Sequence, residues 1–294
     1  MEWWQMESSV VSGKTRVCGI IGDPIEHTMS PVMHNAAFQE LGIDYVYIPL
    51  RVRQEDVGNA VASMRALNIR GLNVTIPHKM AVIPFLDRLD PLAEKIGAVN
   101  TIVNEDGILT GYNTDATGFL QALLEKEVEP KGKNIIVLGA GGAAKGISFI
   151  LAERGASLVI LNRHLTRARD LAHRISQVFK NQVKALALNE ENLSKVLDRA
   201  DVLINTTSVG MIPDMDITPV PARLLKPGLI VFDIVYNPLK TRLLKESEAI
   251  GAKTISGIEM LVWQGALAFE KWTGRKAPIN LMREEAVEAL RHED

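Results

Sequence analysis

Residues 135–146 read Ile135-Ile136-Val137-Leu138-Gly139-Ala140-Gly141-Gly142-Ala143-Ala144-Lys145-Gly146. An apolar run, typical of a strand buried on both faces, leads directly into a G-x-G-x-x-A pattern and then into a predicted helix. In this pattern Gly139 makes a tight turn, Gly141 lets the backbone approach a pyrophosphate, and the small Ala144 lets the helix pack closely on the strand. Free N–H groups at the helix N-terminus favour phosphate. We interpret the stretch as a dinucleotide site rather than a glycine-rich turn kept for packing, with predicted cofactor contacts at Gly139, Ala140, Gly141, Gly142 and Ala143.

The end of the next predicted strand, residues 157–161, indicates which dinucleotide binds. Folds that bind NAD place an acidic residue there, which accepts a hydrogen bond from the ribose 2′-OH. Here the strand is followed by Asn162-Arg163-His164, with Arg167 one helical turn later, and no acid is present. The planar donors of arginine match the oxygens of a 2′-phosphate. We therefore predict NADP as the cofactor; the alternative is a pair of solvated arginines on an exposed loop.

Strands and helices alternate on both sides of this motif, which favours an α/β fold. Before the motif, the pattern predicts strands at 16–21, 45–50, 71–75, 99–103 and 108–110, and helices at 30–41 (with Ser30 as N-cap), 54–67 and 114–124. From the motif onward it predicts strands at 134–138, 157–161, 183–186, 202–205 and 229–233, and helices at 142–154, 166–179 and 189–197, which together form a doubly wound sheet. Helices at 258–273 and 278–291 close the chain.

These elements predict two domains. No strand separates the last two helices, so we expect them to leave the second sheet and return to the first domain. Residues 1–114 then form an N-terminal α/β substrate domain, residues 115–256 an inserted Rossmann domain that binds NADP, and residues 257–294 the C-terminal helices that complete the first domain. We expect a cleft where the two domains join.

The composition excludes several classes of protein. With 33 Lys plus Arg against 35 Asp plus Glu, the chain has no excess charge to attract nucleic acid or an anionic membrane. No run approaches the roughly 20 apolar residues of a transmembrane helix, and residues 1–14 lack the pattern of a signal peptide, so we expect a loose tail. The single cysteine, Cys18, lies in an apolar run and is expected to be a buried side chain. One cysteine allows no internal disulfide, which favours the cytoplasm.

Three polar clusters in the first half follow predicted strands. They are residues 27–30, residues 73–79, and residues 100–101 with 113–115. Ligands of open α/β sheets bind beyond the carboxyl ends of the strands. Hydroxyls, amides, one lysine and one aspartate that converge there suit a small polyhydroxylated anion. The six histidines lack H-x-x-x-H spacing and no Cys-x-x-Cys is present, so no metal site is predicted.

In this order, the motifs resemble those of the shikimate dehydrogenase family over essentially the whole chain from Val17 onward. The motifs that carry the resemblance lie at residues 22–31, 73–79, 97–101, 111–115, 139–146, 162–163, 205–211 and 257–264. The resemblance implies reversible reduction of 3-dehydroshikimate to shikimate with NADPH, a step toward chorismate and the aromatic amino acids. Thr28 stands where a serine is more usual in the family, and His164 where a threonine is common.

The resemblance also implies roles for single residues. Lys79 and Asp115 are implied to be the catalytic pair. Lys79 donates a proton to the alkoxide that hydride transfer leaves, or stabilises its charge while a water carries the proton. The implied substrate contacts are Thr28 and Ser30 at the carboxylate and Asn73, Thr75, Asn100, Tyr236 and Gln264 around the ring. The implied cofactor contacts beyond the glycine loop are Asn162, Arg163, His164, Arg167, Thr206 and Gly257.

Two other functions remain open at this point. The first is a quinate/shikimate dehydrogenase of catabolism that works with NAD(H), against which Arg163 and Arg167 argue. The second is a non-catalytic ligand-sensing protein on the same fold, which is expected to lose Lys79 or Asp115 or to gain a DNA-binding segment. We expect the partners to be small molecules, with no nucleic acid or membrane, and the protein to be a monomer or homodimer.

Overall fold

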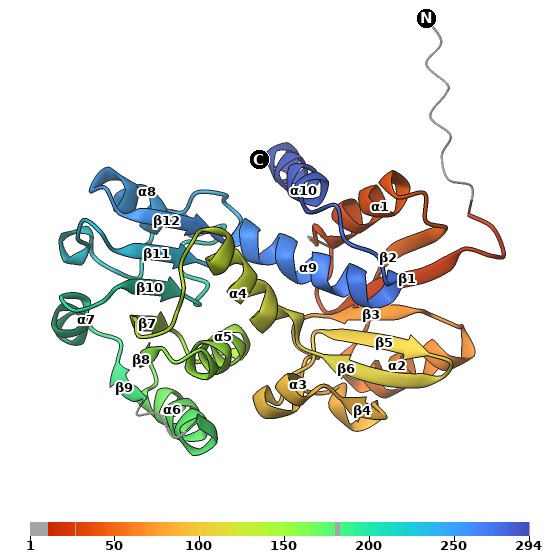
Figure 1. The fold of residues 1–294 in the computed structure, drawn as a ribbon, viewed down its shortest axis with the longest axis horizontal. Coiled ribbons are helices and arrows are strands. Elements are labelled where there is room, and N and C mark those ends of the chain that lie inside the picture. The colour runs from red at the N-terminus through yellow and green to blue at the C-terminus, as the bar shows by residue number, and fades with distance from the viewer. Residues whose placement is uncertain (1–10, 27, 180–182, 294) are drawn as a thin grey trace, which may run out of the picture. The chain divides into compact units, whose positions relative to one another are not determined.

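The computed structural model describes residues 11–26, 28–179 and 183–293 (Figure 1). The chain divides into two compact units. The first unit runs to Thr114 and resumes from Gly265 to His292, and the second unit comprises Asp115–Gln264. Each unit is built on its own six-stranded sheet. The loose tail expected at residues 1–14 falls mostly on residues 1–10, which lie outside the described residues.

The sheet of the first unit mixes parallel and antiparallel strands in the order β2-β1-β3-β5-β6-β4. β1 is parallel to β2 and β3, whereas β5 and β6 form an antiparallel hairpin beside β3. The hairpin turns at Asp106 and Gly107, which both have positive φ. The strands are β1 (Arg16–Gly22), β2 (Tyr45–Arg51), β3 (Gly71–Val74), β4 (Arg88–Leu89), β5 (Thr101–Glu105) and β6 (Ile108–Tyr112).

Helices cover both faces of this sheet. Ile21 and Leu72 pack on one face against Val61 and Met64 of α2. On the other face, the indole of Trp272 occupies the place where a Cβ on Gly71 would lie, so only glycine fits there. The helices are α1 (Ser30–Glu40), α2 (Val57–Ala66, after the 3-10 turn Gln54–Asp56), α3 (Pro91–Ile96), the end of α9 (Gly257–Thr273) and α10 (Ile279–Glu293).

One expectation for the first unit was wrong, and two of its elements were missed. Ser30 is not the N-cap: α1 begins at Ser30 itself, the residue before it is Met29, and no side chain caps this end. The Ser30 side chain is instead buried. The sequence interpretation also missed β4 and α3. Helix α3 had readable signals, because Asp90 caps it by accepting from Leu92 N (3.0 Å) and Gly97 ends it with φ 71°.

The second unit contains the predicted doubly wound sheet. All of its strands are parallel, in the order β12-β11-β10-β7-β8-β9. The strands are β7 (Asn134–Leu138), β8 (Ser157–Asn162), β9 (Lys184–Ala187), β10 (Val202–Asn205), β11 (Ile230–Asp233) and β12 (Lys253–Ser256). The helices are α4 (Thr114–Glu125), α5 (Gly142–Glu153), α6 (Leu165–Phe179), α7 (Glu190–Leu197) and α8 (Arg242–Ala249). Both faces are covered: Leu203 packs with Leu193 of α7 and Leu243 of α8, and Phe232 stacks on Phe119 of α4 at 4.7 Å.

The sequence interpretation missed α8 and β12 and placed the last boundary differently. Helix α8 and strand β12 are short, so their periodicity is weak, although Thr241 caps α8 by accepting from Leu244 N (3.4 Å). The second unit ends inside α9, after Gln264, whereas the sequence placed the boundary at residue 257. Because α9 is one continuous helix, its sequence contains no turn or break from which a boundary after Gln264 could be predicted. No helix in the described part of the chain is long and apolar enough to cross a membrane.

The core of the first unit holds an unusual buried histidine. His34 stacks on Tyr47 at 4.4 Å with an interplanar angle of 12° and lies 5.2 Å from the Trp272 ring. It is fully buried, and neither ring nitrogen has a hydrogen-bond partner. Burial lowers the pKa of His34 from 6.5 to about 3. The ring is therefore neutral in the folded protein at every pH near neutrality.

This histidine makes stability depend on pH. The folded-state pKa of His34 lies below its unfolded value, so the stability it contributes is full above about pH 6.5 and is lost as the pH falls toward 3. We expect the free energy of unfolding to fall by on the order of 2 kcal/mol more between pH 7 and pH 5 in the parent protein than in His34→Leu. Denaturant titrations at the two pH values measure this difference, and equal losses in both proteins would contradict it.

Candidate active site

The loop after β3 is fixed against β1. Thr75 N donates to Ile21 O (2.9 Å), and Asp23 N donates to Ile76 O (3.1 Å). A side chain at Gly22 would collide with the Thr75 methyl group, so glycine permits the two loops to approach. Thr75, a predicted site residue, is thereby held at the carboxyl end of both strands.

The same loop presents Lys79. His78 N donates back to Thr75 O (2.9 Å), which makes a tight turn, and Val99 N donates to Lys79 O (2.8 Å). The buried His78 ring lies within hydrogen-bond distance of Val52 O through Nε2 (2.7 Å). The Lys79 side chain is half-buried. The Lys79 backbone is thus held in place at this loop, and its flexible side chain carries the positive charge.

Four buried polar side chains lie next to this loop, namely Asn73, Asn100, Thr101 and Thr114. Asn73 Nδ2 donates to Asn100 O (3.2 Å) and Thr101 Oγ1 (3.1 Å). Asn100 Oδ1 accepts from Thr114 N (2.6 Å), and Asn100 Nδ2 donates to Thr114 Oγ1 (2.9 Å). The structure thus brings Asn73 and Asn100 together. Thr101 and Thr114 were in the polar clusters of the sequence but were assigned no role.

Thr28 and Ser30 join this group at the start of α1. Thr28 Oγ1 accepts from Ser30 N (3.3 Å). Tyr47 Oη donates to Asn73 Oδ1 (2.7 Å). Burial raises the pKa of Tyr47, and the nearby Ser30 side chain opposes part of this rise. Two predicted residues, Ser30 and Asn73, therefore lie near a tyrosine that the sequence interpretation did not include.

The other predicted substrate residues belong to the second unit. Asp115 is half-buried in the first turn of α4, directly after Thr114. Gln264 is buried on α9, where its Nε2 donates to Leu261 O (3.0 Å). Its backbone packs so closely on Gly118 that a side chain at 118 would collide with it. Tyr236 is half-buried in the loop after β11.

The glycine loop has the geometry expected of a phosphate cradle. Gly139 adopts φ +111°, which turns the chain after β7, and its N–H donates to Leu161 O of the neighbouring β8 (2.8 Å). Gly141 is extended and precedes α5, whose first N–H groups have no carbonyl of an earlier turn to bond. A Cβ at Gly141 or Gly142 would meet no atom within 4 Å. The space in front of the helix N-terminus is therefore open to a ligand.

The predicted 2′-phosphate residues lie together after β8. Arg163, His164 and Arg167 are exposed at the start of α6. The turn is held by Asn162 Nδ2, which donates to His164 O (3.0 Å), and by Arg167 N, which donates to the same carbonyl (3.1 Å). The described strand end has guanidinium groups and no acid, in agreement with the sequence pattern.

Thr206 and Gly257 take packing positions near the cradle and at α9. Thr206 Oγ1 donates to Leu138 O (2.6 Å) and lies where a Cβ of Gly139 would be. A side chain at Gly257 would collide with the Ile234 carbonyl. Both residues therefore hold backbone segments together at the ends of β7 and β11.

Two polar residues of this unit were missed by the sequence interpretation. Asp233, fully buried, accepts from Asn205 Nδ2 (2.9 Å), Thr241 Oγ1 (2.7 Å) and Val235 N (3.1 Å). Burial raises its pKa from 3.8 to about 6 despite these bonds. Lys145 stands in the first turn of α5, where partial burial and then the nearby Arg174 lower its pKa. The position of Lys145 inside the glycine motif is the sequence signal from which it could have been predicted as a candidate site residue.

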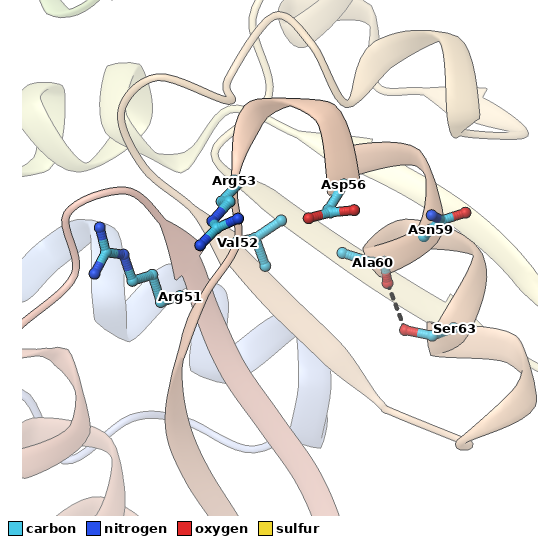
Figure 2. A pocket seen from close by; sticks show the side chains of 7 residues that line it. All are labelled: Arg51, Val52, Arg53, Asp56, Asn59, Ala60 and Ser63. Atoms are coloured by element: carbon cyan, nitrogen blue, oxygen red, sulfur yellow. Dashed lines mark hydrogen bonds between the residues drawn. The ribbon is translucent and has the colours of Figure 1, made fainter.

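A surface pocket of about 530 Å³ lies beside the end of β2 and the start of α2, and Figure 2 shows the side chains that line it. It is lined by Arg51, Val52, Arg53, Asp56, Asn59, Ala60 and Ser63. Arg51 is paired with Asp23 (2.8 Å) and Glu26 (3.6 Å). None of the predicted site residues lines this pocket, so it is separate from the candidate active site. The described residues hold no group of three His, Cys, Asp or Glu side chains suited to a metal ion.

Three family models match the chain. The model described as the shikimate dehydrogenase substrate binding domain matches residues 20–102. The shikimate / quinate 5-dehydrogenase model matches residues 122–235, and the shikimate 5′-dehydrogenase C-terminal domain matches residues 257–287. The matches fall on both units and on the closing helices.

Relatives and solved structures agree with these matches. A shikimate dehydrogenase (NADP(+)) of Dehalococcoides mccartyi (strain CBDB1) is 50% identical over 272 residues, which cover 92% of this chain and 95% of that protein. A shikimate dehydrogenase in complex with NADP⁺ is similar with a TM-score of 0.91 and 42% identity, over 95% of this chain and 97% of that one. The shikimate 5-dehydrogenase of Thermus thermophilus, in complex with NADP(H) and shikimate, gives a TM-score of 0.85 and 38% identity, over 94% and 100%. With half of its residues shared over nearly its whole length, the chain belongs to the shikimate dehydrogenase family.

Proposed function

We propose that this protein is an NADP-dependent shikimate dehydrogenase, which reversibly reduces 3-dehydroshikimate to shikimate. The observation that carries the proposal is the constrained loop that presents Lys79 beside the buried amides of Asn73 and Asn100. This arrangement lies in the part of the chain that matches the family's substrate binding domain. A similar shikimate 5-dehydrogenase structure is in complex with NADP(H) and shikimate.

The residues of the second unit fit NADP. The open cradle at Gly141 and Gly142, at the N-terminus of α5, suits the pyrophosphate. Arg163 and Arg167 suit the 2′-phosphate, because their guanidinium groups are exposed at the strand end where an NAD site carries an acid. We assign Lys145 as a further cation near the phosphates. When bound, NADPH supplies the hydride that the carbonyl carbon receives.

The first unit supplies the groups that act on the substrate. Thr28 and Ser30 bind the carboxylate through their hydroxyls, and Asn73, Thr75 and Asn100 bind the ring. The charge of Lys79 stabilises the negative oxygen that forms as the carbonyl is reduced, and its ammonium donates the proton that completes the alcohol. In the reverse direction the same nitrogen accepts that proton. Asp115, Tyr236 and Gln264 complete the proposed set, with Asp115 as the second catalytic residue.

We propose that the protein acts on small molecules in the cytoplasm, as a monomer or homodimer. Cys18 supports a reducing compartment: it is fully buried, and burial raises the pKa of its thiol, so it behaves as a small apolar side chain. The near balance of acidic and basic residues offers no surface charge suited to nucleic acid.

The role of Lys79 predicts a loss confined mainly to turnover. Lys79→Ala should lower kcat for shikimate oxidation by about a hundredfold to ten-thousandfold, because the proton and charge are supplied mainly in the transition state. The KM for shikimate should change much less. Steady-state kinetics with shikimate and NADP⁺ measure both values, with folding checked by circular dichroism. Lys95→Ala, which removes an exposed lysine of α3, is the matched control. A near-normal kcat in Lys79→Ala would contradict the catalytic role and leave Lys79 as a residue that only binds the substrate.

The role of Arg163 predicts a loss confined to one cofactor. Arg163→Ala should weaken NADP(H) binding by about 10- to 150-fold, as expected from losing one charge-assisted contact. NAD(H) binding should stay within about twofold. Fluorescence titration with both cofactors measures the ratio, and Arg169→Ala, an exposed arginine further along α6, is the control. Equal losses for NADP(H) and NAD(H) would reject the contact with the 2′-phosphate.

A further inference from the structure

Tyr47 of β2 reaches across one strand to the candidate active site. In the sheet, Tyr47 lies opposite Cys18 of β1, and Asn73 of β3 lies opposite Ile20 of β1. Alternate residues of a strand share a face, so Tyr47 and Asn73 lie on the same face of the sheet. The Tyr47 side chain therefore crosses β1 diagonally, and its Oη comes within 2.7 Å of Asn73 Oδ1.

The direction of this hydrogen bond follows from the neighbours of Asn73. The backbone carbonyl of Asn100 can only accept, so the atom of Asn73 that faces it is Nδ2. The Oδ1 atom then faces Tyr47, whose hydroxyl must be the donor. Burial raises the pKa of Tyr47 well above its ordinary value of 10. The hydroxyl therefore keeps the proton that it donates.

Helix α1 holds Tyr47 in this position through two of its residues. Asn35 bonds both backbone groups of Tyr47, since its Nδ2 donates to Tyr47 O (2.9 Å) and its Oδ1 accepts from Tyr47 N (2.8 Å). His34 stacks on the ring at 4.4 Å. With its backbone and its ring each in contact with α1, the tyrosine is fixed at full burial.

This arrangement limits how Asn73 can meet a ligand. Both hydrogens of Nδ2 are used, one on Asn100 O and one on Thr101 Oγ1. Only Oδ1 has capacity left, because an amide oxygen has two lone pairs and Tyr47 occupies one. Asn73 can therefore accept a hydrogen bond from a ligand hydroxyl but cannot donate one.

We propose that Tyr47 is a positioning residue for substrate recognition, whose hydroxyl holds the Asn73 carboxamide in the one orientation that accepts a hydrogen bond from a substrate hydroxyl. The inference rests on the proposed function, which assigns Asn73 to the substrate. Without the Tyr47 hydroxyl, the Asn73 oxygen loses its buried donor and the amide is no longer fixed from that side.

The test is Tyr47→Phe, which removes the hydroxyl and leaves the ring that stacks on His34. We expect the KM for shikimate to rise about tenfold, the range of one net hydrogen bond, with kcat and the KM for NADP⁺ within about twofold. Calorimetric titration with shikimate should show the same weakening without turnover. Tyr45→Phe is the matched control, because its hydroxyl in the same strand contacts Trp272 O (3.3 Å) and Arg16 (3.4 Å) and should leave all three values unchanged.

A second step tests whether Tyr47 acts through Asn73. In an Asn73→Ala background, Tyr47→Phe should raise the KM for shikimate no further, because its partner is gone. An unchanged shikimate affinity in Tyr47→Phe, a full tenfold loss that persists in the Asn73→Ala background, or equal losses toward shikimate and NADP⁺ would each overturn the inference. A parent protein that does not oxidise shikimate would reject the proposed function itself, which keeps the two failures distinct.

Discussion

β1 and β3 are parallel neighbours, so their carboxyl ends lie at the same end of the mixed sheet, and the candidate active site of the first unit depends on this constraint. The segments that carry Thr28, Ser30, Thr75 and Lys79 all leave the sheet there. The hairpin reaches the same end from the other direction: β5 is antiparallel to β3, so Asn100 at its start comes next to Asn73. Strand β6 then ends beside the start of β5, which brings Thr114 to Asn100.

Buried polar groups determine how the side chains at the strand ends of both units are arranged. An amide or hydroxyl removed from water without a partner costs several kcal/mol in an apolar setting, so buried polar groups are arranged around one another. In the first unit, Asn73 and Tyr47 meet this demand through directed hydrogen bonds. In the second unit, Asp233 ties Asn205 to Thr241, the residue that caps α8. These bonds join the ends of β10 and β11 to the start of α8.

The sequence by itself determined the α/β class, the dinucleotide fingerprint and most elements. These are local properties: apolar runs mark β7 and β10 with their observed bounds, and Gly139, Gly141 and Arg163 stand at fixed distances from strand ends. Short elements such as β4 and β12 were not predicted, because they contain too few residues to show a periodic pattern. Ser30 was taken as a cap because its type and place suit one, whereas α1 begins at Ser30 itself and no side chain caps it.

Only the tertiary structure decided how the polar residues are oriented. Tyr47 and Asn73 lie far apart in the sequence and on different strands, and no local pattern shows that a side chain crosses β1 between them. The stacking of His34 and the fit of Trp272 over Gly71 depend in the same way on which faces of the sheet and helices meet. Local spacing fixes which residues reach a strand end, but the donors and acceptors they meet there come from distant segments, so the hydrogen-bond network is set by the fold.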